Sequence, residues 1–171
     1  MLRGLLLFGA LIAGPAAAEE PQSFDFMGLT TSEAYSGQGT VIGKKCKLKG
    51  RGEEECRGID GSLLGNVPIV NMRARFNGGK LFSVSGETSI GNAESLRKAF
   101  IAKYGPPHVV EDRPWRNKMD INFSQEVAIW RFTDGELRVR VRGAQRDFSS
   151  FTFLADGLAP ESYTQEQPVN F

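Results

Sequence analysis

Arginine is the residue type whose spacing in this sequence best supports binding chemistry. Arg138, Arg140 and Arg142 alternate with apolar residues in the segment ELRVRVR, and Arg131 lies shortly before them. Side chains alternate between the two faces of a strand, so residues two apart share a face at a spacing of roughly 7 Å. The planar guanidinium group is suited to carboxylate or phosphate. The four arginines therefore predict a surface for an anionic partner, either an acidic protein surface, a lipid headgroup or an envelope polysaccharide.

The same pattern also has a simpler interpretation, an ordinary solvated sheet face. Asp120 and Glu126 supply carboxylates for the arginines, and basic residues discourage sheets from pairing edge to edge. Trp115, in the segment RPWRNK, is a second candidate contact, because tryptophan and arginine are enriched at interfaces. A tryptophan that covers the open end of a small core is the alternative.

The residue types used in catalysis form no recognisable constellation. His108 is the only histidine and follows two prolines, with no partner motif nearby, so it is interpreted as an ordinary loop or edge-strand residue. The run Glu53–Glu55 is better explained by pairing with lysines than by acid–base catalysis. No phosphate-binding loop, nucleophile elbow or metal-binding helix motif is present. The sequence therefore predicts no catalytic residue, no metal site and no cofactor, and a small hydrolase is kept only as a second alternative.

The two cysteines flank the segment KLKGRGEEE, which predicts a hairpin with a three-residue Gly50–Gly52 loop. The register that follows pairs Cys46 with Cys56, Lys47 with Glu55 and Lys49 with Glu53. Opposite charges support this pairing, and an oxidising compartment permits a disulfide. A zinc site is the alternative, but two thiols without nearby histidines supply half of the ligands that zinc requires. We therefore predict a Cys46–Cys56 disulfide.

The first 18 residues are typical of a secretory signal peptide. A charged residue, Arg3, precedes the apolar run Leu5–Ile12, and Ala16–Ala18 forms a small-residue cleavage site. The run is shorter than the roughly 20 residues that span a bilayer, so a transmembrane anchor is not expected. The mature chain would start at Glu19 in the periplasm or outside the cell.

Charge argues against a dedicated nucleic-acid binder. The whole chain has 21 basic and 20 acidic residues, and removing residues 1–18 takes away only one charged residue, Arg3. The mature chain is thus electrically neutral, whereas nucleic-acid binders carry basic patches and a high isoelectric point.

The segment Val127–Arg142 predicts the central hairpin of the fold. Asp134-Gly135 is typical of the tight turn that joins two antiparallel strands. That turn would pair Phe132 with Leu137, Trp130 with Val139 and Ala128 with Val141 on one apolar face. It would place Arg131 opposite Arg138, Ile129 opposite Arg140 and Val127 opposite Arg142 on the other face.

Other segments predict two helices and further strands. Thr30 and Glu33 have the spacing of a capping box, so a short helix is expected there, ending before Gly37. The stripe of apolar residues in 93–104 predicts a longer helix, with Asn92 as its N-cap and Gly105-Pro106-Pro107 as its stop. Strands are expected at 40–48, in a return strand of the cysteine hairpin that ends near 59, and at 67–76, 108–112, 119–123 and 150–154. A three-residue loop at 77–79 would set Ala74 opposite Phe82.

These elements predict an α+β fold, an antiparallel sheet with one or two helices packed on one face. The expected organisation is a signal peptide at 1–18, one domain at 19–154 with possible αβββ-like halves at 24–88 and 89–154, and a flexible tail at 155–171.

Two short motifs in this chain also occur in a known family of exported proteins. They are Gly28-Leu29-Thr30 with Glu33, and Leu96, Phe100, Tyr104, Gly105 and Pro106. With them the chain resembles the small exported modules of the outer-membrane assembly lipoproteins (SmpA/OmlA type) and the β-lactamase-inhibitor-like proteins. It differs from the lipoproteins in having no cysteine after the apolar run. The resemblance implies a role in protein–protein contact. The function expected is therefore a non-enzymatic protein-binding module, with a binder of anionic lipid or polysaccharide as the alternative.

Overall fold

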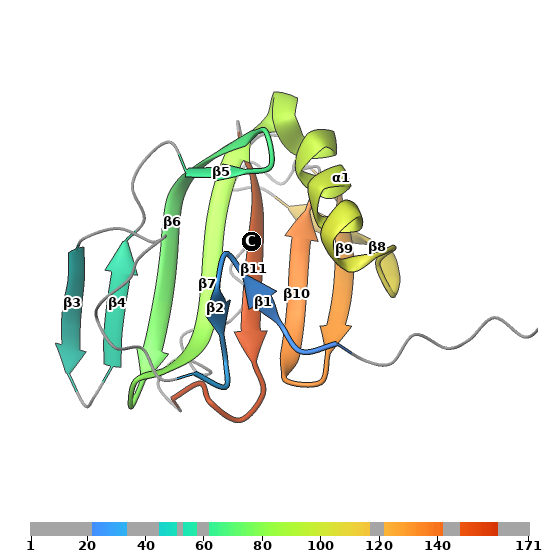
Figure 1. The fold of residues 1–171 in the computed structure, drawn as a ribbon. Helices are drawn as coiled ribbons and strands as arrows, with labels where there is room; N and C mark the ends of the chain where they lie inside the picture. Colours follow the sequence, from blue (N-terminus) through green and yellow to red (C-terminus); the bar gives the residue numbers. More distant parts are fainter. Residues whose placement is uncertain are drawn as a thin grey trace, which may run out of the picture.

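The computed structural model of this protein describes residues 22–33, 45–50, 53–57, 62–116, 122–141 and 148–160. Within these residues, nine strands form one antiparallel sheet (Figure 1). Their order across the sheet is β3 (Lys45–Gly50), β4 (Glu53–Arg57), β6 (Val67–Asn77), β7 (Lys80–Ser89), β11 (Phe148–Ala155), β10 (Gly135–Arg140), β9 (Asn122–Phe132) and β8 (Val109–Arg116), with β5 (Ser62–Leu64) paired to β6.

The sheet consists of two meanders that meet at its centre. Strands β3, β4, β6 and β7 follow one another across one half, and β8 to β11 follow one another across the other half. The last strands of the two meanders, β7 and β11, pair antiparallel, with Phe153 opposite Val84. One continuous sheet therefore runs through both of the halves expected from the sequence.

The expected α+β fold class is wrong, because the fold is mostly β. The described part of the chain contains a single α-helix, α1 (Ala93–Tyr104), preceded by the 3-10 turn η1 (Ile90–Asn92). Two strands are longer than the sequence predicted: β8 continues to Arg116, beyond the predicted end at 112, and β9 runs from Asn122 to Phe132 where two separate strands were predicted. Pairing with a neighbouring strand extends strands beyond the stretches whose alternation is visible in the sequence.

The helix expected near Thr30 is absent from the described residues. Leu29–Thr30 forms the short strand β2, which pairs with β1 (Asp25–Phe26) as a separate hairpin. The Thr30 hydroxyl does accept a hydrogen bond from the backbone N–H of Glu33 at 3.3 Å, as a capping box requires. Such a contact also closes a turn without a helix. Residues 34–44, where the helix would continue, lie outside the described part.

Helix α1 confirms the prediction from the apolar stripe. Leu96 and Phe100 are fully buried, and the helix ends before Gly105, whose φ of 78° is readily adopted by glycine. The N-terminal end differs in detail, because the Asn92 side chain makes no capping bond and instead donates to the Ser89 hydroxyl at 3.1 Å.

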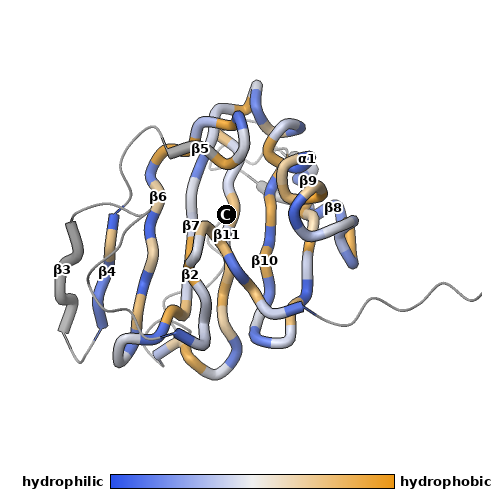
Figure 2. Tube along the Cα trace, viewed as in Figure 1, coloured by the Kyte–Doolittle hydropathy of each residue, from blue (hydrophilic) through white to orange (hydrophobic). Residues whose placement is uncertain are grey.

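Helix α1, the β1–β2 hairpin and β5 lie on the same side of the sheet, called the helix face below (Figure 1). Along the strands of the sheet, hydrophobic residues alternate with more hydrophilic ones (Figure 2). The fully buried side chains on the helix face include Trp130, Leu137, Val139, Phe151 and Phe153. Burial of these residues on one face fixes which side chains must lie on the other.

The N-terminal arm, residues 22–32, completes the core. Phe24 and Phe26 are fully buried, and the Phe24 ring stacks on Phe153 with 3.5 Å between centroids. The Tyr104 hydroxyl donates to the backbone oxygen of Asp25. Burial, with a smaller contribution from the Asp25 carboxylate, raises the pKa of Tyr104 above its ordinary value, so the phenol stays a hydrogen-bond donor.

The register predicted for the β9–β10 hairpin is wrong by two residues. Gly135 pairs with Phe132, and Leu137 pairs with Trp130, so the two-residue turn is Thr133-Asp134. Neither turn residue has a positive φ. Gly135 is required for a different reason: a Cβ there would lie 2.3 Å from the backbone oxygen of Leu154. Because the shift is even, every side chain keeps its predicted face.

The β6–β7 hairpin also differs from the prediction. Its turn has two residues, Gly78-Gly79, both with positive φ, instead of the expected three. A register shift next to the turn then sets Ala74 opposite Val84, where Phe82 was expected. Two adjacent glycines supply the φ values of a type I′ turn without steric cost.

The β3–β4 pairing confirms that Cys46 lies directly opposite Cys56 and Lys47 opposite Glu55. Nearer the turn the register shifts, so that Gly50 takes the place opposite Glu53 that was expected for Lys49. Loop residues 51–52 lie outside the described part, and so do residues 161–171 of the expected tail. Ala155, the first residue of the expected tail, belongs to β11 and is buried.

The disulfide stays a prediction that this register supports. Non-reducing peptide mapping of exported protein is expected to find one linked peptide that contains Cys46 and Cys56. Replacement of Cys56 by alanine should lower the free energy of unfolding by at most about 3 kcal/mol, since the closed loop is short. Two free thiols in exported protein would contradict the prediction.

Candidate functional site

The arginines predicted as a binding surface lie on the face of the sheet opposite α1. Trp130, Leu137 and Val139 point to the helix face, so the alternating Arg131 and Arg138 point away from it. Both are exposed, with side-chain exposures of 64% and 44%. The structure therefore brings these two together on solvent-accessible surface, as predicted from alternation.

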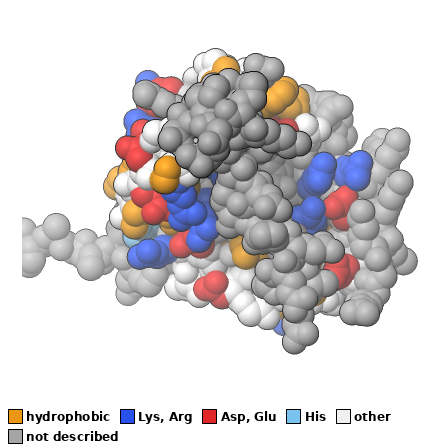
Figure 3. Space-filling view, turned by 180° about the vertical axis from the view of Figure 1, so that it is seen from behind, with side chains coloured by type: hydrophobic (Ala, Val, Ile, Leu, Met, Phe, Trp, Pro, Cys, Tyr) orange, Lys and Arg blue, Asp and Glu red, His pale blue; other side chains and the backbone are white. Residues whose placement is uncertain are grey.

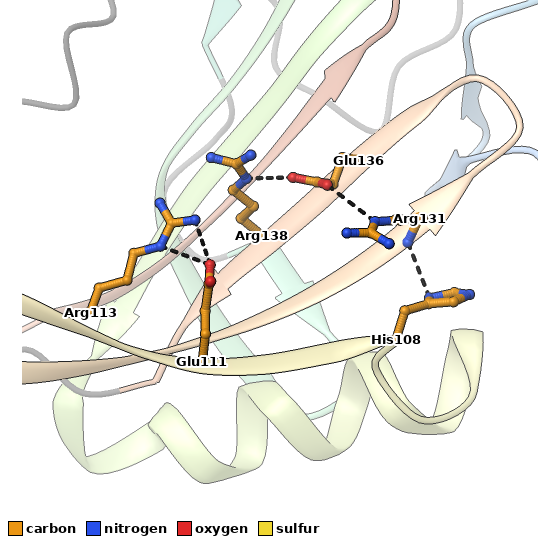
Figure 4. A network of polar contacts seen from close by, with 6 residues as sticks. All are labelled: His108, Glu111, Arg113, Arg131, Glu136 and Arg138. Atoms are coloured by element: carbon orange, nitrogen blue, oxygen red, sulfur yellow. Dashed lines mark hydrogen bonds and ion pairs between the residues drawn. The ribbon is translucent and has the colours of Figure 1, made fainter.

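Glu136 connects the two arginines (Figure 4). One of its carboxylate oxygens lies 2.5 Å from Nε of Arg138, and the other lies 3.7 Å from Nε of Arg131. Arg131 is also the direct cross-strand neighbour of Glu136. The predicted register would have set Arg131 opposite Arg138, and like charges directly opposite each other are destabilising. The observed register replaces that repulsion with an attraction.

Apolar residues lie beneath the arginines. Val127 and Ile129 are buried although they belong to the face opposite α1, and they pair with Arg140 and Arg138 respectively. Long arginine side chains cover apolar surface with their methylene groups while the charged end stays in water. Each of these strand pairs thus places a buried apolar residue beside an arginine.

A second ion pair continues the pattern on the edge strand β8. The Arg113 guanidinium contacts the Glu111 carboxylate, with Nε at 2.7 Å. At the start of the strand, Nδ1 of His108 accepts a hydrogen bond from the backbone N–H of Arg131 at 3.1 Å. This bond fixes the imidazole as the tautomer with its proton on Nε2, and it closes the end of the β8–β9 ladder (Figure 4).

Glu111, Arg113, Arg131, Glu136 and Arg138 are called the charged face below. Viewed from behind, basic and acidic side chains lie next to one another on this side of the sheet, and a second mixed group lies toward β4 (Figure 3). In the second group, the buried Glu55 carboxylate contacts Arg57 at 3.3 Å and Arg75 at 3.1 Å. The second group is therefore centred on a buried carboxylate, whereas Arg131 and Arg138 of the charged face are exposed and its other three side chains are partly exposed.

The remaining predicted site residues are only partly located. Arg140 lies on β10 beside Arg138, is half-buried and is engaged in other interactions. Arg142 lies outside the described residues. The backbone of Trp115 belongs to β8, opposite Phe123, and its side chain is not among those described.

Sequence analysis missed Glu111, Arg113 and Glu136. A signal for them was present, because Glu111-x-Arg113 and Glu136-x-Arg138 each place an acid and an arginine two residues apart on a strand. Residues at that spacing share a face and can pair. The expected carboxylate partners differ as well: Glu126 lies 3.7 Å from Arg97 of α1, and Asp120 lies outside the described part.

The chemistry that this arrangement offers is recognition by charge. Among the described residues, no group of three or more histidine, cysteine or acidic side chains is placed to hold a metal ion. Within the same residues, no helix is both long and apolar enough to cross a membrane. No protein family model, curated protein or solved structure matches the chain.

Proposed function

We propose that this protein is an exported, non-enzymatic module that binds another protein through the charged face, as an inhibitor, adaptor or envelope-assembly factor. The observation that carries the proposal is the sharing of Glu136 by Arg131 and Arg138 on an exposed strand pair. Three arginines alternate there with two glutamates, which leaves a net charge of only +1. A surface of mixed charge complements another mixed-charge protein surface better than it complements a polyanion.

The alternative partner, an anionic lipid or envelope polysaccharide, receives less support from this geometry. Binding to such a partner is driven by a run of cations whose charge is not already neutralised. Here Glu136 contacts two of the arginines, and Glu111 contacts a third. The export step of the proposal depends on the signal peptide predicted at residues 1–18.

Charge reversal tests the proposal. We expect Arg131→Glu with Arg138→Glu to reduce capture of a protein partner from envelope extract by more than about tenfold, because like charges then face the partner. The melting temperature should change little, since exposed ion pairs contribute roughly 0–1 kcal/mol each. Arg131 is chosen in preference to Arg140, which is half-buried and engaged.

The matched control is Lys80→Glu with Lys98→Glu, which makes the same change in net charge at two exposed positions away from the charged face. It should leave capture unchanged. Equal capture by both double variants would contradict the proposal. If no protein is captured, but the parent sediments with anionic lipid vesicles and the arginine variant does not, the alternative partner is the correct one.

A further inference from the structure

Within the described part of the chain, the outer edge of β8 has backbone hydrogen-bonding groups that face no neighbouring strand. Val141 N donates to Glu126 O at 3.0 Å, so even-numbered residues of β9 direct their backbone groups toward β10. Odd-numbered residues of β9 therefore face β8, as the Arg131 N–H contact with His108 also shows. Their partners in β8 are Val109, Glu111, Arg113 and Trp115.

The backbone groups of Val110, Asp112 and Pro114 consequently point away from the sheet. Strand β8 has one neighbouring strand, β9, within the described part of the chain. Pro114 occupies an outward position, where its missing N–H removes no ladder bond; edge strands use proline in this way. The N–H groups of Val110 and Asp112 remain as donors at this edge.

The side chains at the same edge define what kind of segment would fit. Val110 is 51% exposed, which is unusual for a large apolar side chain of this protein. Asp112 is exposed and lies directly opposite Glu126, so two carboxylates are cross-strand neighbours. Arg97 approaches Glu126 only at 3.7 Å and also contacts Glu94 at 3.2 Å. This part of the edge therefore favours an additional cation beside an apolar group.

We propose that the partner protein binds by adding an extended strand to the outer edge of β8, with a basic residue opposite Asp112 and an apolar residue opposite Val110. This inference rests on the proposed function and names its mode of recognition. Strand addition supplies affinity through backbone hydrogen bonds and specificity through alternate side chains. Both of the residues that the incoming strand recognises point to the helix face, and the charged face borders the strand on its other side.

The test uses the mature protein and a fluorescent synthetic peptide made of Lys-Thr-Val-Thr repeats, with a control peptide in which each lysine is replaced by glutamate. Binding is measured by anisotropy. Asp112→Pro removes no ladder bond, but it removes both an outward N–H and the carboxylate. We therefore expect it to weaken lysine-peptide binding by about twentyfold, of which about tenfold is the value of one hydrogen bond and about twofold that of an exposed charge pair. Asp112→Asn keeps the N–H and should weaken binding of the lysine peptide by only about twofold, the effect expected from loss of one exposed charge pair.

Pro114→Ala provides a variant that does not threaten the fold. It restores an outward N–H, so we expect tighter binding by up to about tenfold. Hydrogen exchange gives an independent readout: bound peptide should slow exchange of the Val110 and Asp112 amides, while those of Glu111 and Arg113 are already slow in the free protein.

Three results would overturn the inference. The first is unchanged affinity of Pro114→Ala for the lysine peptide. The second is unchanged exchange of the Val110 and Asp112 amides at the highest peptide concentration. The third is a concentration-dependent dimer that Asp112→Pro abolishes, which would make a second copy of this chain the occupant of the edge. If edge variants retain capture of the partner and the charged-face variant loses it, the proposed function stands without this mode of binding.

Discussion

Trp130→Ala is expected to lower the free energy of unfolding by about 3–5 kcal/mol, the usual cost of removing a large buried aromatic side chain. Trp130 is fully buried on β9, and its ring lies 6.0 Å from that of Phe100 on α1. Its indole N–H donates to the backbone oxygen of Gly105 at 2.9 Å, directly after the helix. The substitution therefore opens a cavity and also leaves a carbonyl without its partner.

Urea unfolding followed by far-ultraviolet circular dichroism measures this loss. Trp130→Phe separates its two causes, because it keeps most of the buried ring and removes the N–H donor, at an expected cost of about 1–3 kcal/mol. Val110→Ala, at an exposed position, should change stability by less than about 0.5 kcal/mol. An unfolding midpoint of Trp130→Ala equal to that of the parent would contradict the position of Trp130 between sheet and helix.

Asp134→Ala is expected to cost about 2–3 kcal/mol, because charge-assisted hydrogen bonds contribute about 1.5–3 kcal/mol each and this carboxylate is partly exposed. Its Oδ1 accepts a hydrogen bond from the backbone N–H of Phe24 at 2.8 Å, and its Oδ2 accepts one from the Thr31 hydroxyl. One turn residue thus holds both ends of the N-terminal arm. Without it, the arm loses its main polar attachment to the sheet.

A double-mutant cycle tests that coupling. Phe24→Ala alone should cost about 3–5 kcal/mol, and the combination with Asp134→Ala should cost at least about 1 kcal/mol less than the sum, since both changes release the same arm. Asp156→Ala is the matched control: only its backbone N–H bonds to Asp134, so loss of the side chain should have little effect. Strict additivity of the two changes would show that Asp134 does not hold the arm in place.

Patterns over a few neighbouring residues predicted the features of the fold that depend only on local backbone geometry. Alternation predicted the faces of the side chains from Val127 to Phe132 in β9 and of those in β10, and helical spacing with Gly105 as the stop predicted α1 within its observed bounds. These signals are read over a few residues. They hold because side-chain direction follows directly from backbone geometry.

Long-range contacts decided the features that the sequence did not predict. The pair Asp134-Gly135 is typical of a type I′ turn, but Asp134 binds an arm 110 residues away in the chain, and Gly135 makes room for the backbone of β11. The true turn lies one residue before the predicted one, so the strand register shifts by two residues, and this shift creates the Arg131–Glu136 neighbours of the candidate site. The pattern of residues within one strand contains no information about the distant segments that this strand contacts.

The central claim is that the charged face contacts a protein partner, and site-specific photocrosslinking in cells that export the protein tests it most directly. A photo-reactive amino acid in place of Arg113 would lie on the charged face, and the same residue in place of Lys98 would lie on the exposed side of α1. Irradiation should link the first variant, but not the second, to one protein of defined mass. Arg131→Glu with Arg138→Glu in the same chain should remove that product. Absence of a protein crosslink at position 113, or equal crosslinking at both positions, would contradict the claim.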